Sequence, residues 1–244
     1  MSRSKLLSRK MANTTESLDL YAKVEDLLEN KEAITRLYHF YYDILSTYDF
    51  ATLLDVGCGS GAYLLALQER FPFVKAKGVD LSGVMVERAK AKGVNAEAVD
   101  LCALDGRFDV MTAVFDMMNY LPKEALKGFF ACVREHLSDG GYFIFDINTL
   151  FGFETVAVGA YVVEDESCFL AIDSDFEAGA YTADFTLFEA NNGCYVKTQE
   201  RITQYYHPLK RLVKASGMKL VASHELSLYE MDEPDKMVIV LQKV

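Results

Sequence analysis

The stretch LLDVGCGSGAY, at residues 53–63, is the part of the sequence that decides the fold. It contains a short apolar run at 53–56, three glycines at alternate positions (Gly57, Gly59 and Gly61), and the start of an amphipathic segment that continues to residue 71. This pattern predicts a strand, a tight turn and a helix. Such a turn needs positive φ angles and bare backbone for a ligand to approach, and glycine provides both at little cost. The free N–H groups of the following helix would face that ligand, so we expect a nucleotide-like molecule here.

The spacing of the glycines narrows the kind of ligand. Dinucleotide-binding turns place the third glycine three residues after the second, whereas Gly61 follows Gly59 by two. With Asp55, the turn reads Asp-x-Gly-x-Gly-x-Gly, which resembles motif I of the class I S-adenosylmethionine-dependent methyltransferases. The resemblance implies that the cofactor site contains the whole turn: Asp55, Gly57, Cys58, Gly59 and Gly61.

Composition sets limits on the partners. The chain has 244 residues and is 51% hydrophobic, enough for one α/β domain with an elaboration. The net charge of −11 comes from 36 acidic and 25 basic side chains and disfavours nucleic acid as a substrate. No apolar run approaches the roughly 20 residues that a membrane span needs. The N-terminus lacks an apolar secretory core, so we expect a cytoplasmic protein without a membrane partner.

Five cysteines are scattered along the chain without a Cys-x-x-Cys pair: Cys58, Cys102, Cys132, Cys168 and Cys194. Their odd number and wide spacing predict reduced thiols, and neither they nor the four histidines show the spacing of a metal site. Cys58 lies inside the glycine turn with no histidine placed beside it by sequence. We therefore interpret it as a small turn residue rather than a nucleophile.

Hydrophobic periodicity predicts the order of elements. Two helices are expected within 14–46, further strands at 75–80, 96–99, 108–114, 142–147, 219–225 and 236–241, and helices that include one from Pro122 to the glycines of SDGG (138–141) and one at 208–216. Ser82 is expected to cap the helix after the second strand. The resemblance implies a doubly wound, Rossmann-like sheet of seven mostly parallel strands, the last one antiparallel.

Residues 156–206 interrupt this α/β pattern with alternating and aromatic runs separated by turn signals. We interpret them as an antiparallel β meander inserted after the fifth strand. The predicted organisation is an N-terminal helical cover at 1–50, a methyltransferase domain at 51–155 and 207–244, and the insert at 156–206. The insert is interpreted as a lid over the acceptor, with core extension or a dimer contact as the alternatives.

Side chains at the predicted strand ends complete the cofactor site. Asp80 follows Gly57 by 23 residues, at the end of the second strand, where a carboxylate can bind a ribose diol. In the resembled family an acid at the end of the third strand holds the adenine amino group, and Asp100 occupies that position with Leu101 next to it. The resemblance also implies that Leu81, beside Asp80, and Phe115, at the end of the fourth strand, contact the cofactor. It further implies that Tyr21 of the N-terminal helical cover lines the cofactor site. For Tyr21, packing on the sheet is the alternative.

Candidates for the acceptor site are Asp116, Asn119, Asn148, Arg201, Tyr205 and Tyr206. They follow the fourth and fifth strands or return from the insert, and loop capping or packing is the alternative for each. The segment FDMMNYL (115–121) is similar to one in small bacterial methyltransferases that carry a β insert. Methyl transfer is an in-line displacement with an activated leaving group, so approach and orientation matter more than a catalytic triad.

Three functions are weighed. The first is an S-adenosylmethionine-dependent methyltransferase acting on a small molecule. The second is a nicotinamide-dependent oxidoreductase, which the spacing of Gly59 and Gly61 and the lack of a clear Tyr-x-x-x-Lys pair disfavour. The third is a non-catalytic protein that binds the sulfonium cofactor as a sensor. The sequence identifies neither the acceptor nor the methylated atom, and it leaves open whether the chain forms a homodimer.

Overall fold

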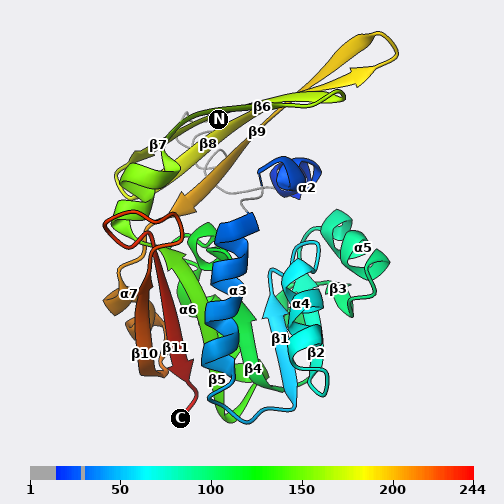
Figure 1. The fold of residues 1–244 in the computed structure, drawn as a ribbon. Helices are drawn as coiled ribbons and strands as arrows, with labels where there is room; N and C mark the ends of the chain where they lie inside the picture. Colours follow the sequence, from blue (N-terminus) through cyan, green and yellow to red (C-terminus); the bar gives the residue numbers. More distant parts are fainter. Residues whose placement is uncertain (1–14, 29–30) are drawn as a thin grey trace, which may run out of the picture.

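The computed structural model describes residues 15–28 and 31–244, and its larger sheet has seven strands (Figure 1). In chain order these are β1 (Thr52–Val56), β2 (Lys75–Asp80), β3 (Ala96–Ala98), β4 (Phe108–Ala113), β5 (Leu137–Asn148), β10 (Lys219–Leu226) and β11 (Lys236–Gln242). Their spatial order is β10-β11-β5-β4-β1-β2-β3. Only β11 runs antiparallel to its neighbours β5 and β10. This confirms the predicted doubly wound sheet with an antiparallel last strand.

Helices cover both faces of this sheet. They are α3 (Lys31–Leu45), α4 (Ala62–Arg70), α5 (Gly83–Ala91), α6 (Leu126–His136) and α7 (Leu209–Ser216). The remaining helix, α2 (Thr15–Leu28), packs on the second sheet instead. Successive residues of β1 point to opposite faces, so Leu53 packs in the core beneath α3 and α4 while Leu54 packs beneath α6 and α7. Both are fully buried, as expected for a central parallel strand. In Figure 1, α3 crosses in front of the sheet and α6 lies behind it.

The second sheet is antiparallel and has four strands: β6 (Gly159–Glu164), β7 (Cys168–Glu177), β8 (Ala180–Asn191) and β9 (Cys194–Tyr205). The two-residue turns 178–179 and 192–193 have positive φ angles at both positions, as hairpins of this length require. This confirms the predicted inserted meander. A π-helix, Gly152–Ala157, precedes it and was not predicted.

The second sheet lies beyond the carboxyl ends of the parallel strands, with α2 beside it (Figure 1). Leu20 and Val24 of α2 pack on the inner face of the sheet against Leu170, Phe185 and Ile202. The N-terminal helix therefore covers the alternating apolar face of the insert. That helix also contacts α5, so it bridges the two sheets.

The helix predicted from Pro122 to the SDGG glycines begins and ends at other residues in the structure. Residues 122–125 form a turn, closed by the Ala125 N–H and the Pro122 carbonyl, and α6 begins only at Leu126. The SDGG glycines do not cap the helix, because β5 already includes them and α6 ends at His136. Gly140 has φ 78°, and its N–H donates to the carbonyl of Lys243. Pairing with the C-terminal segment therefore outweighs the local preference for a helix cap.

The prediction that all cysteines are reduced thiols is wrong for one pair. Cys102 and Cys132 form a disulfide, with their Cα atoms 5.0 Å apart. They are 30 residues apart in sequence and meet because the 3₁₀ helix η1 (Leu101–Ala103) packs against α6. The other three cysteines are free.

The described part of the chain lacks two kinds of feature, a metal site and a membrane-spanning helix. Residues 15–28 and 31–244 contain no group of three or more histidine, cysteine or acidic side chains that could hold a metal ion. None of the helices in these residues is both long and apolar enough to cross a membrane.

Candidate active site

The three glycines of the turn after β1 have different surroundings. All three have positive φ angles, of 73° at Gly57, 52° at Gly59 and 77° at Gly61. A Cβ atom at Gly57 would lie 2.5 Å from Cγ of Met117, and one at Gly61 would lie 2.9 Å from Cβ of Ala89. At Gly59 a Cβ atom would meet nothing within 4 Å. Two glycines therefore permit close packing inside the protein, and Gly59 presents bare backbone to open space, where a ligand can approach.

Asp80 lies against this bare backbone at the end of β2. One carboxylate oxygen accepts the N–H of Gly59 at 2.9 Å, and the other accepts the N–H of Ser82 at 2.8 Å. Each oxygen can accept a second hydrogen bond, which suits a ribose diol. Burial raises the pKa of Asp80, and the backbone N–H groups oppose that rise. Leu81 beside it is 59% exposed, an apolar surface at the same edge.

Asp100 follows β3, which pairs with β2, so the two acids lie at the same edge of the sheet. Its side chain is exposed and accepts the N–H of Cys102 at 2.8 Å, which caps η1. Leu101 is buried in the core on the α6 side. The disulfide from Cys102 to Cys132 then ties this turn to α6.

Asp55 is buried beneath the glycine turn. Its carboxylate accepts the hydroxyl of Thr112 at 2.7 Å. Burial raises the pKa of Asp55 to about 8, although the Thr112 hydrogen bond acts in the opposite direction. The hydroxyl of Tyr63 is also buried close to Asp55.

Aromatic rings from α3 and α4 line this region, and they were not predicted as site residues. The ring centroids of Tyr38 and Tyr63 are 5.2 Å apart, and those of Tyr38 and Phe115 are 5.9 Å apart. Tyr63 lies inside the glycine-rich stretch, and this position was the sequence signal that could have identified it as a site residue. Tyr38 could not be distinguished from the packing residues of its helix.

A strained turn follows β4. Phe115 and Asp116 have φ angles of 58° and 50°, a region that non-glycine residues rarely occupy. The Phe115 N–H donates to Oδ1 of Asp146 and the Asp116 N–H to Oδ2, both at 2.8 Å. Asp146 is 0% exposed at the end of β5. The strained turn is therefore held by a buried carboxylate that was not predicted as a site residue, although it lies in the strand predicted at 142–147.

Asp116 and Asp146 share one buried cation. Nζ of Lys236 lies 2.5 Å from Oδ1 of Asp116 and 3.0 Å from Oδ2 of Asp146, and the lysine side chain is 5% exposed. Burial opposes the charge of Lys236, but the two carboxylates outweigh it and raise its pKa. The hydroxyl of Tyr41 donates to Asp146 at 2.9 Å, and the amide of Gln204 donates to Asp116 at 2.5 Å. These five residues are called the Asp116 network below.

Asn119 lies between Asn148 and Tyr205, and its side-chain amide binds the backbone of both. Asn119 is fully buried: its side-chain oxygen accepts the N–H of Asn148 at 2.9 Å, and its nitrogen donates to the carbonyl of Tyr205 at 2.8 Å. Asn119 thus joins the ends of β5 and β9. That is the capping alternative, and it positions the end of the insert beside the Asp116 network.

Arg201 is not brought to this edge. It lies on β9 directly opposite Asp184 of β8 and forms two contacts with its carboxylate, at 2.6 and 2.5 Å. Both side chains are more than half exposed. The structure thus places Arg201 in a surface ion pair on the insert.

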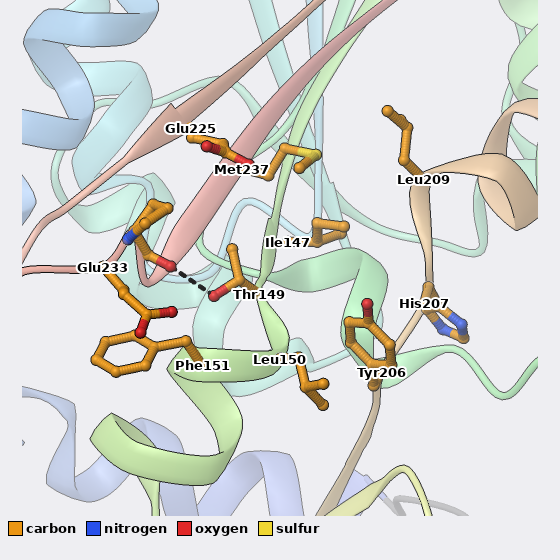
Figure 2. Close-up of a pocket in the computed structure, with 11 residues that line it drawn as sticks. Ile147, Thr149, Leu150, Phe151, Tyr206, His207, Leu209, Glu225, Glu233 and Met237 are labelled. Atoms are coloured by element: carbon orange, nitrogen blue, oxygen red, sulfur yellow. Dashed lines mark hydrogen bonds between the residues drawn. The ribbon is translucent and has the colours of Figure 1, made fainter.

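Tyr206 lines a cavity of about 260 Å³ at the ends of β5 and β11 (Figure 2). The other lining residues are Ile147, Thr149, Leu150, Phe151, His207, Leu209, Glu225, Glu233, Pro234 and Met237. The hydroxyl of Thr149 donates to the carbonyl of Pro234 at 2.7 Å along one wall. None of the residues of the glycine turn lines this cavity.

Tyr21 lies on α2 between the two sheets. Its ring packs edge-on against Phe185 of β8, with centroids 6.4 Å apart. On the same helix, Asp19 accepts the hydroxyl of Ser82 at 2.6 Å, next to Asp80. Helix α2 therefore reaches the cofactor edge through Asp19, while Tyr21 packs on the insert.

Comparisons with known proteins agree with this geometry. Residues 53–141 match the model of the methyltransferase domain family. The chain is 31% identical over 112 residues to the uncharacterised protein RP028 of Rickettsia prowazekii, a match that covers 42% of this chain and 44% of the relative. The chain spans less than half the length of that relative.

Two solved structures are similar over almost the whole chain. One is an S-adenosylmethionine-dependent methyltransferase from Clostridium acetobutylicum, with a TM-score of 0.71, 20% identity, and coverage of 92% of this chain and 96% of that one. The other is CalS10 of Micromonospora echinaspora, an amino pentose methyltransferase solved with S-adenosylmethionine bound. Its TM-score is 0.68 at 20% identity, with 96% and 98% of the two chains covered. Residues 53–141 are therefore similar to a methyltransferase domain, and the chain has the fold of S-adenosylmethionine-dependent methyltransferases.

Proposed function

We propose that the protein transfers a methyl group from S-adenosylmethionine to a small-molecule acceptor. The observation that carries this proposal is the bare backbone of Gly59 beside the carboxylate of Asp80, with the Asp116 network at the same edge of the sheet. When bound, the sulfonium compound supplies an activated methyl group, which an acceptor atom attacks in line with the departing sulfur.

The residues at the cofactor edge have distinct roles in this proposal. The backbone of Gly59 leaves room for the ligand, and both oxygens of Asp80 accept from the ribose hydroxyls. Asp100, exposed at the end of β3, faces the adenine, while η1 behind it is fixed to α6 by the disulfide. Phe115 and Tyr38 form an aromatic wall on the other side of the turn. CalS10, which has the same fold, was solved with S-adenosylmethionine bound, and this supports the choice of cofactor.

The insert and α2 act together as the cover of the acceptor site. Helix α2 packs on the inner face of β6–β9 and also contacts α5 at the cofactor edge. A cover built in this way encloses a small molecule and excludes water from the reacting atoms. The net charge of −11 disfavours nucleic acid, and the amino pentose acted on by CalS10 is a small acceptor.

Transfer of a labelled methyl group tests the proposal. Incubation of the full chain with methyl-labelled S-adenosylmethionine and a small-molecule cell extract should give a labelled product that is absent when the protein is omitted. Binding of the cofactor without any labelled product would favour the non-catalytic sensor instead. Homodimer formation and cytoplasmic location stay predictions, to be examined by light scattering and by fractionation.

A further inference from the structure

Asp116 is the accessible acid of the Asp116 network. Asp146 is 0% exposed and accepts four hydrogen bonds, from two backbone N–H groups, from Tyr41 and from Lys236. The side chain of Asp116 is 18% exposed. Two carboxylates face one ammonium, so the network carries a net charge of −1. That excess charge meets solvent at Asp116.

Tyrosines from three separate elements lie within electrostatic reach of Asp116. Tyr120 ends the 3₁₀ helix η2 (Met117–Tyr120), Tyr181 lies on β8 of the insert, and Tyr229 lies between β10 and β11. Burial raises the pKa of all three hydroxyls, and the negative charge of Asp116 raises each further. These tyrosines therefore stay protonated near neutral pH and supply rings and hydroxyl groups rather than a base.

Surroundings of this kind select a cation. An ammonium gains a charge-assisted hydrogen bond from a carboxylate, and aromatic rings near the carboxylate can add attraction for a cation. A neutral alcohol carries no charge for the Asp116 carboxylate to attract, and an acceptor that carries a carboxylate is repelled by the excess negative charge of the network. The strained turn at Phe115 and Asp116 fixes where the carboxylate lies, because its N–H groups are bound by buried Asp146.

We propose that the acceptor is an amine and that Asp116 holds its nitrogen. This inference rests on the proposed methyltransferase function. The bound ammonium first releases one proton through Asp116 to solvent. The freed lone pair then forms the N–C bond to the methyl carbon while the C–S bond breaks with its electron pair left on sulfur. The products are the methylated ammonium and the neutral thioether.

The position of the label in the product tests the acceptor class. The full chain is incubated with trideuteromethyl S-adenosylmethionine and a small-molecule cell extract, and labelled products are fragmented by mass spectrometry. A label on nitrogen is expected. A label on oxygen, sulfur or carbon overturns the amine assignment while leaving the methyltransferase function intact. Cofactor binding without a labelled product overturns both.

Substitution of Asp116 tests its role once the labelled amine is identified. Asp116→Asn should lower kcat/KM for that amine roughly 10- to 100-fold, the size expected for losing a charged hydrogen-bond partner. The Kd for S-adenosylmethionine should stay within about threefold, which also shows that the variant is folded. Asp184→Asn is the matched control, because its carboxylate lies on the exposed side of the insert, paired with Arg201. Full activity of a folded Asp116→Asn variant overturns the assignment.

A second variant keeps the test decisive if Asp116→Asn does not fold. Tyr229 is 45% exposed, so Tyr229→Leu removes the ring with little loss of core packing. We expect a rise in KM for the amine of roughly five- to tenfold, consistent with the loss of one ring from around a cation, with an unchanged Kd for the cofactor. An unchanged KM for the amine contradicts the role of the tyrosines.

Discussion

The cofactor edge and the acceptor edge of this protein are built in different ways. The cofactor edge comes from one part of the sequence, residues 57–100. Gly57, Gly59 and Gly61 lie in one turn, Asp80 ends β2, and Asp100 follows β3. The acceptor edge joins Tyr41, the 115–116 turn, Asp146, Gln204 and Lys236, which come from five separate segments. Backbone geometry defines the first edge, whereas a buried charge network defines the second.

The largest loss of stability expected from a single substitution comes from breaking the Asp116 network at its centre. Asp146→Ala leaves Lys236 with one carboxylate and removes the acceptor of the Phe115 and Asp116 N–H groups. Breaking a buried charge pair in this way typically costs about 3–5 kcal/mol. Urea denaturation should show that loss in the free energy of unfolding. Asp184→Ala, which removes an exposed carboxylate, serves as the control, and equal losses for the two variants would show that the network does not support the fold.

Two glycine substitutions contrast packing with ligand approach at the cofactor edge. Gly61→Ala forces a Cβ atom to within 2.9 Å of Ala89, so it should destabilise the fold by about 1–3 kcal/mol. Gly59→Ala places its Cβ atom in open space, so only backbone strain opposes folding. Because φ is positive at this position, that strain should cost about 1–2 kcal/mol. Its main effect should be weaker binding of S-adenosylmethionine. Calorimetric titration and thermal unfolding of both variants measure this, and normal cofactor binding by Gly59→Ala would place the ligand elsewhere.

A third prediction concerns pH and Asp55. Burial raises the folded-state pKa of Asp55 from 3.8 to about 8, so between these values the folded protein keeps a proton that the unfolded chain releases. This contribution to stability is fully present below about pH 4, falls as the pH rises through the window, and levels off above pH 8. Its steepest slope is about 1.4 kcal/mol per pH unit.

Asp55→Asn should flatten that part of the pH dependence and make the free protein more stable than the parent at pH 8. Asp109→Asn provides the comparison. Slight burial acts to raise the pKa of Asp109, but hydrogen bonds from Ala51 and Thr52 outweigh it and lower that pKa. Its contribution to stability is therefore lost only in acid, and the slope from pH 5 to 8 should remain in this variant. Retention of the full slope in Asp55→Asn would mean that Asp55 is ionised in the folded protein.

The smallest effect is expected at the surface of the insert. Arg201 was selected from the sequence as an acceptor-site candidate, yet it forms an exposed ion pair with Asp184. Exposed pairs contribute about 0–1 kcal/mol to stability. Arg201→Ala should therefore change neither the free energy of unfolding by more than that nor the rate of methyl transfer. A large loss of transfer with an intact fold would return Arg201 to the acceptor site.

The same contrast explains what the sequence could predict. The order of the elements along the chain, the insert and the glycine turn follow from periodicity and from local backbone requirements, which neighbouring residues carry. The doubly wound sheet was implied by the resemblance to a known family. Lys236 and Gln204 gave no local signal, because their partners are 120 and 88 residues away from them at Asp116. The prediction that all cysteines are reduced failed for the same reason, because the packing of η1 on α6 brings Cys102 to Cys132. The SDGG turn was misplaced because pairing with Lys243 overrides its local preference.

The measurement that tests the central claim most directly is calorimetric titration of the full chain with S-adenosylmethionine, its demethylated product and NAD. The first two should bind at one site per chain, and NAD should not bind. Asp80→Ala should remain folded and weaken both ligands by about 1.5–3 kcal/mol, the loss expected for hydrogen bonds to a charged group. Tight binding of NAD without a response to the sulfonium compound, or unchanged affinity in folded Asp80→Ala, would contradict the account.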